Sequence, residues 1–120
     1  MIDHVNIGVS DLAASRAFYE RSLSALGYAV VMERAYGVGF GIDGKPDFWI
    51  SARPVSGPLH VAFAGGDRAT VDAFHREAVA AGGRDNGPPG LRPAYHPSYY
   101  GAFVLDPDAN NVEVVAHGLG

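Results

Sequence analysis

Short runs in which apolar and polar residues alternate occur in both halves of the chain, and they predict strands. Val5, Ile7 and Val9 alternate with polar or small residues, and Val61 and Phe63 repeat this pattern in the second half. A period of two places the apolar side chains on one face of a strand. Further runs of strand character lie at 28–34, 38–42, 48–52, 99–105 and 112–116, with turns at 43–45 and 106–111.

Two other stretches have the spacing of amphipathic helices. Apolar side chains recur every three or four residues over 12–26 and again over 71–79, and glycines follow both stretches. Ser10 or Asp11 can cap the first helix, and Asp67 can cap the second. The segment from residue 86 to residue 97 is rich in Gly and Pro, and it is predicted to be a loop.

The two halves are similar to each other. Residues 4–27 align with residues 60–83 without a gap, and eight positions are identical, among them His4 with His60. A repeat of this kind indicates one supersecondary unit used twice. We expect an α+β fold of two βαβββ modules, 1–56 and 57–120, in a single domain over 1–120, although one strand of the second module is not evident. The expected architecture is a partly closed mixed sheet that bears a cavity, with the helices outside.

Strand parity selects the side chains that face this cavity. If the apolar residues that follow His4 and His60 pack on the helices, both imidazoles point the other way, and Glu113 does so between Val112 and Val114. Trp49 has the same parity. A single histidine on a strand is more often an ordinary hydrogen-bonded residue, but the repeated position favours a shared role. Two imidazoles and one carboxylate are a set that holds a divalent ion with open coordination positions.

These features resemble the vicinal oxygen chelate superfamily, which includes glyoxalase I, extradiol dioxygenases, fosfomycin-resistance transferases and bleomycin-binding proteins. The most specific stretches are DHVNIGVSDLAASRAFYERSLSALGY and YYGAFVLDPDANNVEVVAH. The resemblance implies that His4, His60 and Glu113 ligate the ion, with Fe, Mn, Zn and Ni all left open. The corresponding turn in the family usually reads DPDGN, so Ala109 in place of Gly implies slight strain or another turn type.

The same resemblance bears on the reaction. Trp49 lies near the position where glyoxalase I has a carboxylate, and an indole can neither ligate a metal nor abstract a proton. A dioxygenase-like enzyme acting on neighbouring oxygens is therefore favoured. The alternatives are a glyoxalase-type lyase or isomerase, a thiol transferase, and a non-catalytic protein that sequesters a ligand. Relatives of this length also imply a homodimer, whose sites are either shared between chains or contained within each chain.

Other polar and aromatic residues are candidates for contact with the substrate. His96 lies in a segment bracketed by prolines, where it is either an acid/base group or an exposed loop residue. Taking Phe103 as helix-facing, parity turns Tyr100 toward the cavity, and the aromatic residues favour a flat or apolar substrate portion. The candidates are therefore His96 and Tyr100 for catalysis, and Trp49, Asn6 and Tyr99 for substrate binding.

Composition restricts the function classes further. Apolar residues make up 48% of the chain and charged residues 18%, the net charge is −4, and the arginines are scattered. This balance argues against nucleic acid or membrane partners and leaves a small molecule as the expected one. The absence of cysteine excludes a thiolate nucleophile and restricts metal ligands to His, Asp and Glu. The opening residues lack the pattern of a signal peptide, so we expect a cytoplasmic protein.

Overall fold

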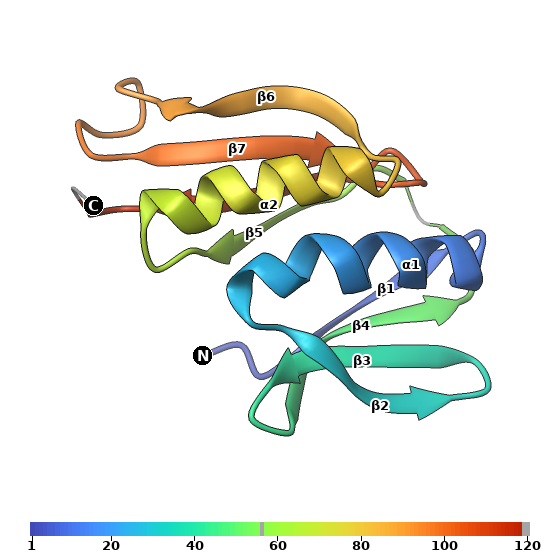
Figure 1. Ribbon diagram of the computed structural model, residues 1–120. Coiled ribbons are helices and arrows are strands. Elements are labelled where there is room, and N and C mark those ends of the chain that lie inside the picture. Colours follow the sequence, from blue (N-terminus) through green and yellow to red (C-terminus); the bar gives the residue numbers. More distant parts are fainter. Residues whose placement is uncertain (56, 119–120) are drawn as a thin grey trace.

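A computed structural model describes residues 1–55 and 57–118, so Ser56, at the expected boundary between the modules, lies outside the described residues. The order of strands and α-helices is the same in both halves, which confirms the α+β fold built from two βαβββ modules (Figure 1). No helix in the described part is long and apolar enough to cross a membrane. The first module comprises β1 (Val5–Val9), α1 (Leu12–Ser22), a 3-10 helix η1 (Leu23–Leu26), β2 (Ala29–Arg34), β3 (Gly37–Ile42) and β4 (Lys45–Ala52). The second comprises β5 (His60–Ala64), α2 (Arg68–Ala80), β6 (Arg84–Leu91), β7 (Tyr100–Leu105) and β8 (Asn111–Ala116).

Each module forms its own mixed sheet. The strand orders are β1-β4-β3-β2 and β5-β8-β7-β6, with β1 parallel to β4 and β5 parallel to β8. Figure 1 shows α1 and α2 side by side between the two sheets, one over each sheet. Within the described chain the two sheets therefore stay separate with the helical layer between them, and they do not join into one sheet with the helices outside.

The helical layer lies inside because the apolar faces of both sheets contribute to one core. The ring centroid of Phe63 in β5 lies 5.2 Å from that of Phe48 in β4 and 5.7 Å from that of Tyr28. Helix α2 also packs against both α1 and η1. Burying apolar surface of both modules in one interior favours this closed arrangement. The opposite face of each sheet is left to the outside.

Both helices begin at the aspartates that the sequence indicated. The Asp11 carboxylate accepts a hydrogen bond of 3.0 Å from the amide of Ala14, and Asp67 accepts one of 2.8 Å from Thr70. These bonds satisfy backbone donors that have no partner inside the helix. Ser10, the other candidate for the first cap, instead bonds through its hydroxyl to Asp108 of the second module.

The strand that was not evident from sequence is β6, and the loop predicted from residue 86 is wrong over its first part. Residues 84–91 pair with β7, although the register shifts on both sides of Gly87. Gly and Pro in this segment hide the alternation that identifies a strand. The adjacent strand β7 supplies the hydrogen-bond partners that the local sequence does not predict.

A buried carboxylate connects the two modules. The Tyr19 hydroxyl of α1 donates to Asp106, which follows β7, and both residues are almost fully buried. Asp106 also accepts bonds of 2.8 and 3.0 Å from the backbone and side-chain nitrogens of Asn110. Burial, followed by the charge of Asp106, raises the pKa of Tyr19 above its ordinary value, so the phenol keeps its proton and the bond.

The turn between β7 and β8 carries the strain expected at Ala109. This residue has φ +65°, in the left-handed region that costs a side chain roughly 1–2 kcal/mol. Its amide nitrogen donates to the Asp106 carbonyl at 2.9 Å, which holds it in that conformation.

Replacing Ala109 by glycine should raise the free energy of unfolding by about 1 kcal/mol, because glycine adopts this conformation without steric cost. Ala17→Gly is the matched control, since Ala17 is exposed in the middle of α1. There the same substitution should destabilise the protein by about 0.5–1 kcal/mol. Urea unfolding followed by circular dichroism measures both. If the Ala109→Gly protein is no more stable than the parent, the left-handed conformation of Ala109 does not destabilise the fold.

Candidate functional site

The outer face of the second sheet brings two of the predicted metal ligands together. Ala62 in β5 is the register partner of Glu113 in β8, so His60 and Glu113 lie on the face opposite α2. The distance from His60 Nε2 to Glu113 Oε1 is 2.8 Å. The imidazole is 56% exposed, whereas the carboxylate is 2% exposed. Two donor atoms suited to a divalent ion are therefore adjacent.

Tyr99 holds the other oxygen of the same carboxylate. Its hydroxyl donates to Glu113 Oε2, on the side away from His60. Gly101 makes this possible, because a Cβ there would lie 3.2 Å from the Tyr99 ring and 3.3 Å from Glu113 Oε2. Burial, followed by the bond to the Glu113 carboxylate and the carboxylate's charge, raises the pKa of Tyr99 to about 12. Near neutral pH the phenol is therefore a hydrogen-bond donor to Glu113.

The structure contradicts the prediction that Tyr100 faces the site. In β7, Phe103 pairs with Glu113, so Phe103 lies on the outer face and the alternate residues face the helix. The Tyr100 hydroxyl accordingly donates to Asp72 of α2 at 2.6 Å. The prediction was wrong because Phe103, although apolar, lies on the outer face, where Arg92 covers its ring. On the site side, Tyr99 occupies the place that was expected for Tyr100.

His96 lies beside Tyr99, with ring centroids 5.4 Å apart. The amide of Ser98 donates to His96 Nδ1 at 3.1 Å, so that nitrogen is an acceptor and the proton is on Nε2. His96 Nε2 lies 2.7 Å from His117 Nδ1, which accepts this proton's hydrogen bond. The segment that holds His96 is therefore tied to the end of β8. In this arrangement His96 Nε2 is directed at His117.

The outer face of the first sheet holds the remaining candidates. His4, Asn6 and Trp49 line a hollow of about 270 Å³ together with Tyr36, which the sequence analysis did not single out. Trp49 is the cross-strand partner of Gly39 in β3, where a Cβ would approach the indole to 2.9 Å. Asn6 accepts a bond of 2.8 Å from the Ser51 hydroxyl, which fixes its amide. We call this surface the module-1 face, and the surface of His60, Tyr99, Phe103 and Glu113 the module-2 face.

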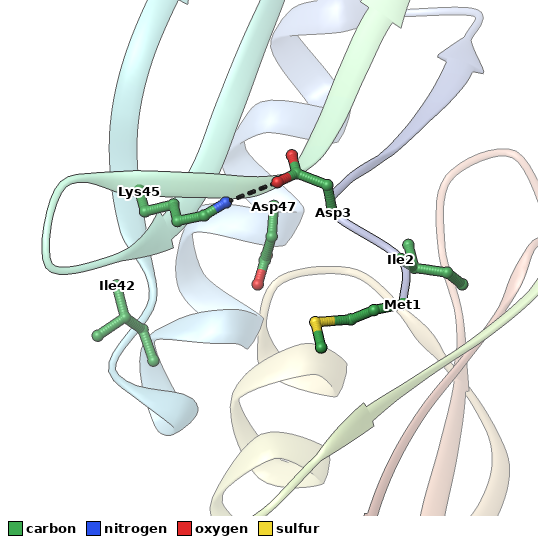
Figure 2. Close-up of a pocket in the computed structure, with 6 residues that line it drawn as sticks. All are labelled: Met1, Ile2, Asp3, Ile42, Lys45 and Asp47. Atoms are coloured by element: carbon green, nitrogen blue, oxygen red, sulfur yellow. Dashed lines mark hydrogen bonds and ion pairs between the residues drawn. The ribbon is translucent and has the colours of Figure 1, made fainter.

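The residue before His4 orients its ring. Asp3 accepts from His4 Nδ1 at 2.9 Å and from Lys45 Nζ at 3.1 Å. Figure 2 shows the Asp3–Lys45 contact beside a hollow of about 430 Å³ that the first three residues and the β3–β4 hairpin enclose. The bonds from His4 and from Lys45 lower the pKa of Asp3, so this carboxylate stays ionised near neutral pH and accepts from His4 Nδ1. The Nε2 atom of His4 is thereby the one available to a ligand.

The predicted triad does not converge within one chain. Among the described residues, no three His, Asp or Glu side chains lie close enough together to hold one ion. The two faces belong to different sheets, and each turns away from its own helix (Figure 1). The chain therefore presents two partial sites, one with His4 and one with His60 and Glu113.

Sequence reasoning overlooked Phe103, Arg92 and His117 on or beside the module-2 face. The Arg92 guanidinium carbon lies 5.4 Å from the Phe103 ring centroid, and the His60 ring lies 6.2 Å from the same centroid. Phe103 could have been found from the cross-strand register with Glu113. Arg92 and His117 lie outside the regular strands, so no periodicity pointed to them.

Comparisons with known proteins agree with this architecture. A glyoxalase/bleomycin resistance protein from Albidiferax ferrireducens T118 is 28% identical, with a TM-score of 0.82 over 96% of this chain and 97% of that one. A glyoxalase/bleomycin resistance protein/dioxygenase family enzyme from Burkholderia phytofirmans PsJN is 23% identical, with a TM-score of 0.75 over 98% of both chains. A lactoylglutathione lyase from Agrobacterium tumefaciens is 21% identical, with a TM-score of 0.72 over 97% of this chain and 92% of that one.

A search of curated proteins gave no match. The sequence model of the Glyoxalase/Bleomycin resistance protein/Dioxygenase superfamily, in contrast, matches residues 1–114. This match includes the first module, the second module as far as Val114 and every candidate ligand, and it confirms the resemblance drawn from the sequence. The chain belongs to the Glyoxalase/Bleomycin resistance protein/Dioxygenase superfamily.

Proposed function

We propose that this chain is a small metal-dependent enzyme that binds a divalent ion through His4, His60 and Glu113. Its substrate is a small molecule with neighbouring oxygens, and a dioxygenase-type reaction is favoured. The observation that carries the proposal is the 2.8 Å contact between His60 Nε2 and the nearly inaccessible carboxylate of Glu113.

The chemistry of these donors fits a metal. Among the described residues, no Lys or Arg lies within ion-pairing distance of Glu113, whose contacts are an imidazole and a phenol. A buried carboxylate is costly without a compensating cation. Imidazole nitrogen and carboxylate oxygen are ligands that Fe²⁺, Mn²⁺, Zn²⁺ and Ni²⁺ all accept. A divalent ion beside His60 and Glu113 would provide that compensation.

A complete ligand set requires a second copy of the chain. His4 is on the module-1 face, and within the described residues it does not join the other two ligands. In a C2 dimer, the module-1 face of each chain meets the module-2 face of its partner, which makes two equivalent sites. Of the two dimer types that the sequence allowed, the separation of the ligands supports the one with shared sites.

The remaining candidate residues would bind the substrate or orient the ligands around the ion. When bound, the ion polarises neighbouring substrate oxygens as a Lewis acid. Trp49 offers a flat apolar wall on the module-1 face, and Asn6 offers a fixed amide there. His96 is the candidate acid/base group, and Tyr99 holds Glu113 Oε2, so Oε1 is the oxygen that would hold the ion. Because Trp49 can neither ligate nor abstract a proton, this set favours the dioxygenase type over the glyoxalase type.

His4→Ala and His60→Ala should each weaken metal binding by more than about 100-fold. Loss of a residue that only supports a ligand lowers metal affinity by about 10–100-fold, and loss of the ligand itself should cost more. Calorimetric titration with Mn²⁺, Zn²⁺ and Ni²⁺, and anaerobic titration with Fe²⁺, measures the affinities. His75→Ala is the control, since His75 lies on α2 and bonds Asp85 of β6, away from both faces. This variant should bind metal like the parent. Unchanged affinity in His4→Ala and His60→Ala would refute the ligand assignment.

The metal-loaded protein should consume oxygen with catechol and leave a hemithioacetal unchanged. The physical reason is the ligand set, which leaves positions for two substrate oxygens and has no carboxylate at position 49 to move a proton. An oxygen electrode and absorbance spectroscopy follow the two reactions. Hemithioacetal isomerisation without oxygen uptake would favour the lyase or isomerase. Tight binding of a compound with no turnover would favour a sequestering protein.

Mixed dimers should distinguish shared sites from sites within one chain. A His4→Ala chain and a Glu113→Ala chain carrying different affinity tags are co-expressed, and the mixed dimer is isolated with both tags in succession. If sites are shared, one site of the mixed dimer has all three ligands and the other lacks two. Metal analysis should then find one tightly bound ion per mixed dimer and none in either homodimer. Absence of a bound ion from the mixed dimer, or a monomer by light scattering, would contradict shared sites.

A further inference from the structure

We infer that Arg92 forms an anion-binding subsite on the module-2 face, so that the substrate carries a carboxylate or a similar anionic group. The identification of this anion as part of a substrate rests on the proposed function. The subsite itself depends only on the position, packing and charge of Arg92.

Arg92 lies directly beside the candidate ligands. It follows the last residue of β6, and its amide donates to the Tyr99 carbonyl at 2.8 Å. Its guanidinium carbon lies 5.4 Å from the centroid of the Phe103 ring. Phe103 is the cross-strand partner of Glu113, and its ring also lies 6.2 Å from that of His60. The Arg92 guanidinium and the His60 imidazole therefore lie near the same aromatic ring, that of Phe103.

Two glycines of β6 leave space for the Arg92 guanidinium, and a backbone hydrogen bond holds it there. Arg92 Nη2 donates to the Pro88 carbonyl at 2.7 Å, which ties the side chain back over β6. A Cβ at Gly87 would lie 3.2 Å from Nη2, and one at Gly90 would lie 3.1 Å from Nη1. Both contacts are tighter than ordinary packing. The glycines that concealed β6 in the sequence are thus the residues that leave space for this cation.

The charge of Arg92 has no counterpart nearby. Across residues 1–55 and 57–118, no carboxylate lies within 4.0 Å of its guanidinium, whereas Arg16 and Arg21 each pair with a glutamate. A guanidinium has five N–H groups, and the backbone carbonyls of Pro88 and Leu91 take only two. The remaining donors suit a carboxylate, which can accept two parallel bonds from one guanidinium.

The surroundings define the ligand class more closely. Phe103 lies under the guanidinium and beside His60, so a ligand held by Arg92 would have an apolar or aromatic part against that ring. Its oxygens would then point toward His60 and Glu113. The flat or apolar substrate portion expected from the sequence is extended by an anionic group. Benzoate and benzamide are suitable probes, because they share the ring and differ mainly in charge.

The test is a titration of metal-free protein with benzoate and with benzamide, followed by two-dimensional NMR of the backbone amides around Phe103. Benzoate should bind at least about tenfold more tightly than benzamide, the effect of one charge-assisted pair. Arg92→Gln should abolish this preference, and Arg92→Lys should retain part of it because the charge remains without the fork. Arg84→Gln, at the start of β6, is the matched control and should behave like the parent.

Equal affinities for the two probes in the parent, or a benzoate preference that survives in Arg92→Gln, would overturn the subsite. The amide spectra show whether each variant is folded, and Arg92→Lys provides the second test if Arg92→Gln is not. Metal binding is not needed for these measurements. If benzoate preference depends on Arg92 while metal fails to bind, the subsite stands and the proposed enzyme fails. If metal binds and the preference is absent, only the subsite fails.

Discussion

The arrangement of the two modules depends on the buried carboxylate of Asp106. It accepts four hydrogen bonds, from the Tyr19 hydroxyl, from both nitrogens of Asn110 and from the amide of Asp108. One of these donors belongs to the first module and the others to the turn after β7. Removing any of them would leave part of a buried charge unpaired, which is expensive in a protein interior. The pairing therefore fixes where α1 lies against the second module.

The position of the candidate site follows from that junction. Because the modules meet through their helices and the apolar faces of their sheets, the polar faces of both sheets are directed outward. His4 with Trp49 and His60 with Glu113 are consequently presented separately, each pre-arranged by its own module. Asp3 orients one imidazole, and Tyr99 holds the carboxylate that contacts the other. The chain thus presents two separate groups of candidate residues, each held by hydrogen bonds within its own module.

The sequence predicted well what depends on local periodicity. Alternation placed His60 and Glu113 on one face, and the internal repeat predicted matching modules, with Ser10 or Asp11 capping the first helix and Asp67 the second. It failed where tertiary contacts override local pattern. Phe103 is apolar but lies on the polar face, covered by Arg92, and this reversed the assignment of Tyr99 and Tyr100. How the two sheets are placed relative to each other is not encoded in any periodicity, because it depends on contacts between residues far apart in the chain.

The composition of β6 has a consequence for which strands can be extended by another chain. β6 is one edge of its sheet, and Pro88 and Pro89 have no amide hydrogen to offer to a further strand. Edge prolines of this kind oppose indiscriminate strand-to-strand aggregation. β5, at the other edge of the same sheet, contains no proline and keeps its full set of backbone donors. The sheet is thus asymmetric, with one edge closed to further pairing by its chemistry and the other, which carries His60, still able to pair.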